Sequence, residues 1–233
     1  MKLNFNQQRM AIIIFARLNS RRLPKKVMSK VGSKPLLLFI IDRIKKNSNF
    51  RLPIIVATSK NKSDNEIEMF CKKNKIKIFR GELNDVFKRN LDCIKKFKLE
   101  SFIRVCADRP FFDVRLMDKM IKKFLYSNFD IITNQYPRTY PKGLACEIAK
   151  TSIFLKNEKN IMLKRHREHI FEYFYENNKN YKIYNFRLVK NFKNLLKKDF
   201  SINNNNDLIK INKLYNKYID QDYIDILKIL WLF

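Results

Sequence analysis

The chain has 233 residues, 45% of them hydrophobic, so it is long enough to enclose a sizeable core. Its formal net charge of +28 is carried by lysines spread along the whole chain without an RNA-binding motif, so we expect no specific nucleic-acid partner. The apolar runs are too short for a membrane span and the four cysteines match no zinc or disulfide spacing, which argues against a membrane-spanning protein or a disulfide scaffold and favours a cytoplasmic location.

Apolar runs of strand length alternate with helical patterns through the first 135 residues. Strands are predicted at 10–16, 53–59, 76–81, 101–108 and 129–135, and helices at 34–46, 63–71, 84–98 and 113–127. Helix starts are predicted at a capping box from Ser63 to Glu66, at Asn84 or Asp85, and at Asp113. This alternation predicts an α/β fold with a mostly parallel sheet and helices on both faces.

After Gly143 the alternation weakens. The patterns predict a strand at 144–150, helix over 151–178, a half-buried strand at 181–189, and a short strand, an asparagine-rich turn and a helix over 199–218. No linker or repeat interrupts the chain, so we expect one domain spanning residues 1–233, with its least regular part at 137–190.

The loop after the first strand is the most informative stretch. Parallel strands end at one edge of a sheet, and ligands bind at that edge. The loop has no glycine before Gly32 but carries five cations: Arg17, Arg21, Arg22, Lys25 and Lys26. It is neither a Walker A loop nor a dinucleotide fingerprint. Arginine and lysine side chains can hold phosphate in place of backbone N–H groups, and a solvated basic loop is the alternative.

Two further features suggest or exclude a metal site. Asp108 ends the fourth strand at the same edge, where a carboxylate suits Mg²⁺ in an enzyme that uses nucleotides; a helix cap or a partner for Arg109 is the alternative. His166 and His169 would share one face of a helix, but no third ligand accompanies them, so we expect no zinc site.

Several segments, in order along the chain, resemble those of the CMP-sugar synthetases, the KDO and acylneuraminate cytidylyltransferases. They are "ARLNSRRLPKKVM" with "GSKPLL", "IIVATSKNKSDNEI", "FRGELNDVFKRN", "RVCADRPFFD", "YPRTYPKGLACEI", "REHIFEYF" and, most weakly, "FSINNNNDL". The resemblance extends from about residue 11 to 208 and is greatest to the spore-coat-polysaccharide cytidylyltransferase-like branch of that family.

The resemblance implies a Rossmann-like fold of the nucleotide-diphospho-sugar transferase type. It implies that CTP and a sugar acid, KDO-like or nonulosonate, give CMP-sugar and pyrophosphate with Mg²⁺, for surface polysaccharide biosynthesis. Carried over by position, the nucleotide-binding residues would be Ala16, Arg17, Ser20, Arg22, Lys26 and Thr58. The catalytic residues would be Arg17, Lys26 and Asp108, and the metal ligands Asp108 and Asn203. The substrate-binding residues would be Arg138, Tyr140, Glu147, Arg167, Glu168 and His169, and related synthetases form homodimers through the region of 137–190.

The chain departs from the family's pattern at several positions. Lys25 and Ala107 replace glycines, Ala145 replaces an acidic residue, and Asn203 replaces the second acidic metal ligand. A neutral amide can coordinate Mg²⁺ but supplies no charge. Two alternatives therefore stay open: a member that binds a nucleotide or nucleotide-sugar without efficient turnover, and a nucleotidyltransferase that uses another NTP and a sugar-1-phosphate.

Overall fold

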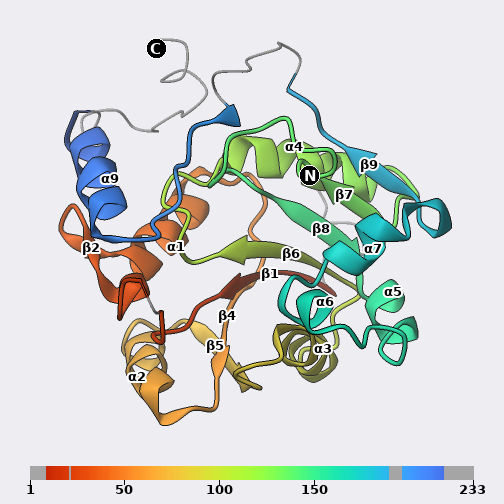
Figure 1. Cartoon of the computed structure of the whole chain (residues 1–233), viewed down its shortest axis with the longest axis horizontal. Coiled ribbons are helices and arrows are strands. Elements are labelled where there is room, and N and C mark those ends of the chain that lie inside the picture. The colour runs from red at the N-terminus through yellow and green to blue at the C-terminus, as the bar shows by residue number, and fades with distance from the viewer. Residues whose placement is uncertain (1–8, 21, 189–195, 218–233) are drawn as a thin grey trace.

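The computed structural model describes residues 9–20, 22–188 and 196–217, and seven strands form one sheet in the order β5-β4-β1-β6-β8-β7-β9 (Figure 1). The strands are β1 (Met10–Phe15), β4 (Ile54–Ser59), β5 (Lys77–Gly81), β6 (Ser101–Cys106), β7 (Ile131–Thr133), β8 (Glu147–Lys150) and β9 (Ile183–Asn185). All pairings are parallel except those of β8, which runs antiparallel to β6 and β7. The predicted mostly parallel α/β fold is confirmed, and because β8 is reversed, its first residue lies at the edge where the other strands end.

Helices cover both faces of the sheet (Figure 1). They are α1 (Leu36–Asn47), α2 (Asn65–Lys73), α3 (Val86–Lys96), α4 (Val114–Leu125), α5 (Thr151–Lys156), α6 (Lys164–Glu168), α7 (Glu172–Glu176) and α9 (Asn205–Lys217). Ile12 and Ile14 of β1 pack into a core with α1, α2 and α4, whereas Ala11 and Ile13 pack into a core with α3, α5 and α7. Burial on both faces explains why β1 is a continuous apolar run.

Two of the three predicted helix starts are capped as expected, and the third is not. Asp85 and Asp113 each accept a hydrogen bond from the backbone N–H three residues on, as predicted. The capping box predicted at 63–66 is wrong. Helix α2 begins at Asn65, and the carboxylate of Asp64 is buried and bonded elsewhere, so it makes no cap.

The single helix predicted over 151–178 is also wrong, because the chain there forms the three short helices α5, α6 and α7. The breaks let Phe171 and Phe174 pack on Phe154, with ring centroids 5.4 and 4.6 Å away. As a result His166 is buried in α6 and His169 is exposed after it, so they do not share a helix face. No group of three metal-ligating side chains occurs among the described residues.

The last described segment returns to the edge of the sheet. The strand predicted near 199 is a single bridge between Lys142 and Asp199, and the strand predicted at 181–189 is shorter, with residue 189 outside the described part. The backbone N–H of Ile202 then donates to the carbonyl of Asp108 at 2.9 Å. Helix α9 follows and packs on the small hairpin of β2 (Lys30–Val31) and β3 (Lys34–Pro35).

The sequence predicted neither a disulfide framework nor a membrane-spanning helix. All four cysteines are free, and burial raises the pKa of Cys71 and of Cys93 to about 12. Within the described ranges, every helix is too short or too polar to cross a bilayer.

Gly143→Ala should lower the free energy of unfolding by about 2 kcal/mol or more. Gly143 has φ +89°, and an added Cβ would lie 2.6 Å from the carbonyl carbon of Phe200. Urea denaturation followed by circular dichroism measures this. Lys142→Ala, at the exposed neighbouring residue, is the control and should change the free energy by less than about 0.5 kcal/mol. An unchanged midpoint for Gly143→Ala would contradict the packing described.

Candidate active site

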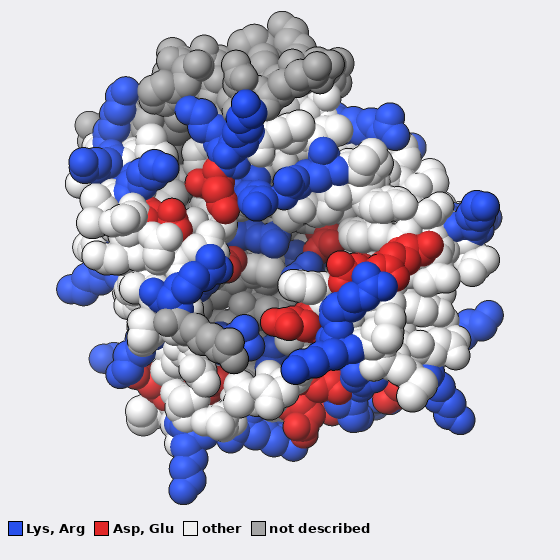
Figure 2. Space-filling view, in the orientation of Figure 1, with Lys and Arg blue, Asp and Glu red and all other residues white. Residues whose placement is uncertain are grey.

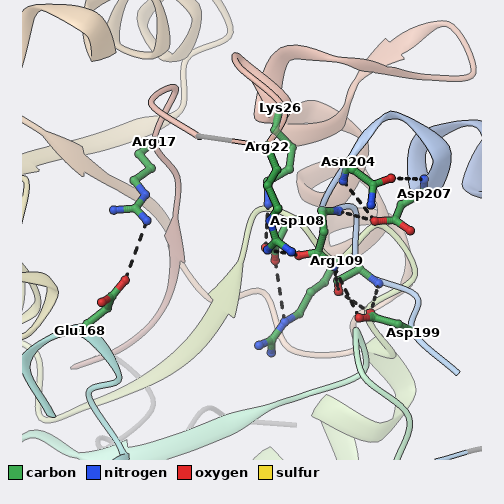
Figure 3. A network of polar contacts seen from close by, with 11 residues as sticks. Arg17, Arg22, Lys26, Asp108, Arg109, Glu168, Asp199, Asn204 and Asp207 are labelled. Carbon is green, nitrogen blue, oxygen red and sulfur yellow. Dashed lines mark hydrogen bonds and ion pairs between the residues drawn. The ribbon is translucent and has the colours of Figure 1, made fainter. Parts of the chain in front are cut away.

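Three segments meet at the edge where the parallel strands end: the loop after β1, the end of β6 and the turn before α9. Lysine and arginine side chains surround a hollow on this face of the molecule, with acidic side chains between them (Figure 2). Lys26 Nζ lies 3.0 Å from a carboxylate oxygen of Asp108 (Figure 3). Arg22 donates to the Asn203 side-chain oxygen at 3.1 Å. The structure thus brings two loop cations directly against both residues assigned to the metal.

The loop holds its shape without glycine through the Leu18 peptide. The carbonyl of Leu18 accepts hydrogen bonds from the N–H of Ser20 at 2.8 Å and of Lys25 at 3.0 Å. Beyond it, a 3₁₀ turn at Lys26–Met28 buries Val27 in the core. The backbone is therefore folded back on itself, and the cationic side chains project from a closed loop.

Lys25 explains one departure from the family's pattern. Its φ of +55° lies in the left-handed region, which glycine adopts at no steric cost, so the usual glycine at this position suits the backbone. Its ammonium group pairs with Glu66 of α2 at 2.7 Å, on the exposed surface. Lys25 therefore adds charge beside α2 rather than at Asp108.

Asp108 lies between two cations. Lys26, whose side chain is 13% exposed, contacts one carboxylate oxygen of Asp108. The Nε of Arg109 lies 3.9 Å from the other carboxylate oxygen of Asp108. Arg109 also donates to the carbonyl of Ala145 at 3.0 Å. The local charge is thus net positive before any ligand is considered, which favours an anionic ligand such as a polyphosphate.

Asn203 is held by its surroundings. Its backbone N–H and that of Asn204 donate to the carboxylate of Asp207, which fixes the turn that opens α9 (Figure 3). Its side-chain NH₂ donates to Ser201 Oγ at 3.1 Å, so the side-chain oxygen faces Arg22. One carboxylate and one amide oxygen are donors that Mg²⁺ accepts when substrate phosphates supply the remaining oxygens, so the residues present fit this metal.

A second group of charges lies across the loop. Arg17 NH2 is 4.0 Å from a carboxylate oxygen of Glu168, and both side chains are about half exposed (Figure 3). Arg167 is instead engaged in the structure: it contacts Asp85 at 2.6 and 2.7 Å and donates to the carbonyl of Ile161 at 2.7 Å. Of the adjacent residues Arg167 and Glu168, it is Glu168 whose side chain faces the loop.

Arg89 of α3 is a buried cation that the sequence analysis missed. Its side chain donates to the carbonyl of Glu82 at 2.6 Å, and it forms no ion pair within the described ranges. Burial, together with the nearby charge of Arg17, lowers the pKa of Arg89 to about 10, which leaves it charged at neutral pH. Helical spacing gave no signal, because a residue two positions from Phe87 and Leu91 points away from their face of the helix; Arg89 is buried because the other side of α3 packs near Gly81 of β5.

Glu147 belongs to a buried polar network. Its carboxylate accepts hydrogen bonds from Arg104 at 2.5 Å and from the hydroxyl of Tyr175 at 2.7 Å. Burial and the charge of Glu147 raise the pKa of Tyr175 well above its ordinary value. Tyr175 stacks on the partly exposed ring of Tyr136, with centroids 4.8 Å apart. Arg104 and Tyr175 were not predicted, because their partners come from distant parts of the chain.

The other assigned residues are scattered around these groups. Ala16 is buried and extends the ladder of β1 through a bond to Ala57. Thr58 is fully buried, and among the described residues its hydroxyl has no hydrogen-bond partner.

Tyr140 is 5% exposed and packs in the hydrophobic core. Ser20 is partly exposed, Arg138 and His169 are exposed, and Arg21 lies outside the described part of the chain.

Comparisons with known proteins identify the family. A family described as "Cytidylyltransferase" matches residues 11–226. The chain is 30% identical over 165 residues to the spore coat polysaccharide biosynthesis protein SpsF of Bacillus subtilis, covering 69% of this chain and 68% of that one. It is 30% identical over 131 residues to the 3-deoxy-manno-octulosonate cytidylyltransferase of Wigglesworthia glossinidia brevipalpis, covering 54% and 51%. The solved structure of a cytidylyltransferase from Leptospira borgpetersenii has a TM-score of 0.87 and 28% identity, covering 95% of this chain and 93% of that one.

Lys25→Gly should be more stable than Lys25→Ala by about 1 kcal/mol, because only alanine is strained at φ +55°. Both variants lose the pair with Glu66, so their difference isolates the backbone term. Parallel thermal or urea unfolding of the two variants measures it. A Lys25→Ala protein as stable as Lys25→Gly would show that the loop does not hold this conformation.

Proposed function

Because the chain belongs to the cytidylyltransferase family and is a nucleotidyltransferase, we propose that it joins CTP to a sugar acid, giving a CMP-sugar and pyrophosphate. Two relatives support the substrate class by their names, one through spore coat polysaccharide and one through 3-deoxy-manno-octulosonate. The observation that carries the proposal is the pairing of Lys26 with Asp108 and of Arg22 with Asn203 at one strand edge. That arrangement presents cations and oxygen donors together, as a triphosphate with a divalent metal requires.

The loop cations suit the charge changes of the reaction. A sugar hydroxyl oxygen attacks the α-phosphorus of CTP and loses its proton to solvent, while the bond from that phosphorus to the pyrophosphate oxygen breaks. Negative charge then builds on the departing pyrophosphate, and we expect Arg17, Arg22 and Lys26 to neutralise it. Lys26 can exchange Asp108 for a phosphate oxygen, since both are anionic oxygen acceptors. Positioning and charge neutralisation account for the catalysis proposed.

Mg²⁺ is the proposed cofactor, with Asp108 and Asn203 as the residues that would hold it. When bound, it would neutralise phosphate charge and polarise the phosphoryl group. Asp108 supplies the one formal negative charge of the pair, so we expect weaker metal affinity than for two carboxylates. Lys26 and Arg109 lie beside Asp108, and their positive charge is not offset by a second acidic ligand.

We assign the sugar to the segment predicted at 137–190, on the side where Glu168 faces Arg17, within one nucleotidyltransferase domain. Glu147 and Arg167 are engaged with protein partners, so we expect them to shape this side rather than to contact the sugar directly. Glu168, His169 and Arg138 are exposed, so a sugar acid can reach them; an arginine suits its carboxylate. A homodimer through the same region remains a prediction.

One observation favours a second candidate, a nucleotide-binding member with little turnover. Asn203 is neutral where an acidic ligand is usual, and Asp108 is flanked by Lys26 and Arg109. This candidate predicts CTP affinity that depends little on Mg²⁺ and no pyrophosphate release with any sugar acid. A thermal-shift series with CTP, GTP, UTP and ATP, with and without Mg²⁺, separates it from the first candidate and also tests a different NTP.

Asp108→Asn should lower the rate of CTP-dependent pyrophosphate release by about 100-fold or more, because it removes the only formal charge among the proposed metal ligands. The assay uses CTP, Mg²⁺ and a panel of sugar acids. Asp92→Asn is the matched control, since Asp92 pairs with Lys88 on the surface of α3 and should leave the rate unchanged. Full activity in Asp108→Asn would refute the metal assignment.

Asn203→Asp should lower the Mg²⁺ concentration for half-maximal activity by roughly tenfold, because it adds a negative charge beside the metal. Asn204→Asp makes the same change of charge one residue away, where the side chain caps α9, and should have a much smaller effect. Equal Mg²⁺ dependence in the two variants would place the metal away from Asn203.

A further inference from the structure

Asp64 is a buried carboxylate to which the proposed reaction assigns no role. It is fully buried and, within the described ranges, pairs with no lysine or arginine. A buried carboxylate is costly unless hydrogen bonds satisfy it. Its position at the start of α2 does not explain it, because it makes no side-chain cap there.

The donors to Asp64 come from two strand ends. One oxygen accepts from the backbone N–H of Leu18 at 2.8 Å. The other accepts from the backbone N–H of Ser59 at 3.1 Å and from the Ser59 hydroxyl. Leu18 follows Arg17 in the cationic loop, whereas Ser59 ends β4. The carboxylate therefore ties the loop after β1 to the neighbouring strand.

The bond to Leu18 fixes more than one residue. The backbone N–H of Leu18 donates to Asp64, and the carbonyl of the same residue accepts from the N–H groups of Ser20 and Lys25. One hydrogen-bonded chain thus runs from the buried carboxylate to the residue before Lys26. The side chain of Leu18 is itself 5% exposed, which anchors the same point.

We infer that Asp64 is the positioning residue of the nucleotide site: it fixes the Leu18 peptide and thereby places Arg17, Arg22 and Lys26 for a triphosphate. This inference rests on the proposed function for the identity of the ligand. The hydrogen-bonded chain supplies the rigidity that a glycine-rich loop obtains from its own backbone contacts to phosphate.

A positioning role and simple electrostatics predict opposite effects on CTP binding when the charge of Asp64 is removed. Asp64 is a negative charge close to a site for an anion, so removing that charge should strengthen CTP binding if charge alone mattered. Asparagine keeps the shape of the side chain but offers one acceptor oxygen, so it cannot accept from both Leu18 and Ser59. If Asp64 acts by positioning, Asp64→Asn weakens CTP binding instead.

The test compares three variants by isothermal titration with CTP and Mg²⁺. Asp64→Asn should raise the dissociation constant roughly tenfold or more, as expected for one lost buried hydrogen bond. Ser59→Ala keeps the hydrogen bond between Asp64 and Leu18, so it should change the dissociation constant for CTP little. Asp118→Asn is the matched control, since that buried carboxylate holds Ser48 and Asn49 far along the chain from the loop. Unchanged or tighter binding in Asp64→Asn, or equal weakening in all three variants, would overturn the inference.

Hydrogen exchange of the wild-type protein provides a readout that needs no ligand or variant. The Leu18 amide should exchange much more slowly than the exposed amides of the same loop, because it donates to a buried carboxylate. Fast exchange at Leu18 would refute the positioning role even if CTP binds. Slow exchange at Leu18 without CTP binding by the wild type would instead refute the proposed function and leave the tie to Asp64 intact.

Discussion

Holding several phosphate charges with side chains alone imposes a constraint on the loop that carries them. Arginine and lysine are long and lose conformational freedom on binding, so their backbone must be fixed by other contacts. Here the fixed point is the backbone of Leu18, whose N–H donates to Asp64 and whose carbonyl accepts from the N–H groups of Ser20 and Lys25. Lys26 directly follows Lys25 and Arg22 lies between the two residues bonded to the Leu18 carbonyl, so both cations belong to the segment that these hydrogen bonds close.

In the described part of the loop, each cation is balanced by a nearby carboxylate or amide oxygen. Lys26 faces Asp108, Arg17 faces Glu168, and Lys25 is drawn away to Glu66. The pairs that line the hollow are partly exposed, so each is individually weak and can be exchanged for a ligand.

Much of the fold followed from local patterns. The apolar run at 10–16 predicted a strand buried on both faces, and Asp85 and Asp113 predicted helix starts because a cap depends on residues only three positions away. The capping box at 63–66 failed because the partners of Asp64 include Leu18, 46 residues distant, which no local pattern reports. The helix over 151–178 failed for a similar reason, since the packing of Phe171 on Phe154 outweighs helical spacing.

The site was predictable in outline but not in detail. Strand order brought Asp108 and the loop to one edge, as expected from a parallel sheet, whereas the pairs formed by Arg22 with Asn203 and by Arg104 with Glu147 required the folded chain. A structure of the protein with CTP and Mg²⁺ tests the central claim most directly. We predict that the side chains of Arg17, Arg22 and Lys26 contact the phosphates; a triphosphate held mainly by backbone N–H groups, or bound away from this loop, would contradict it.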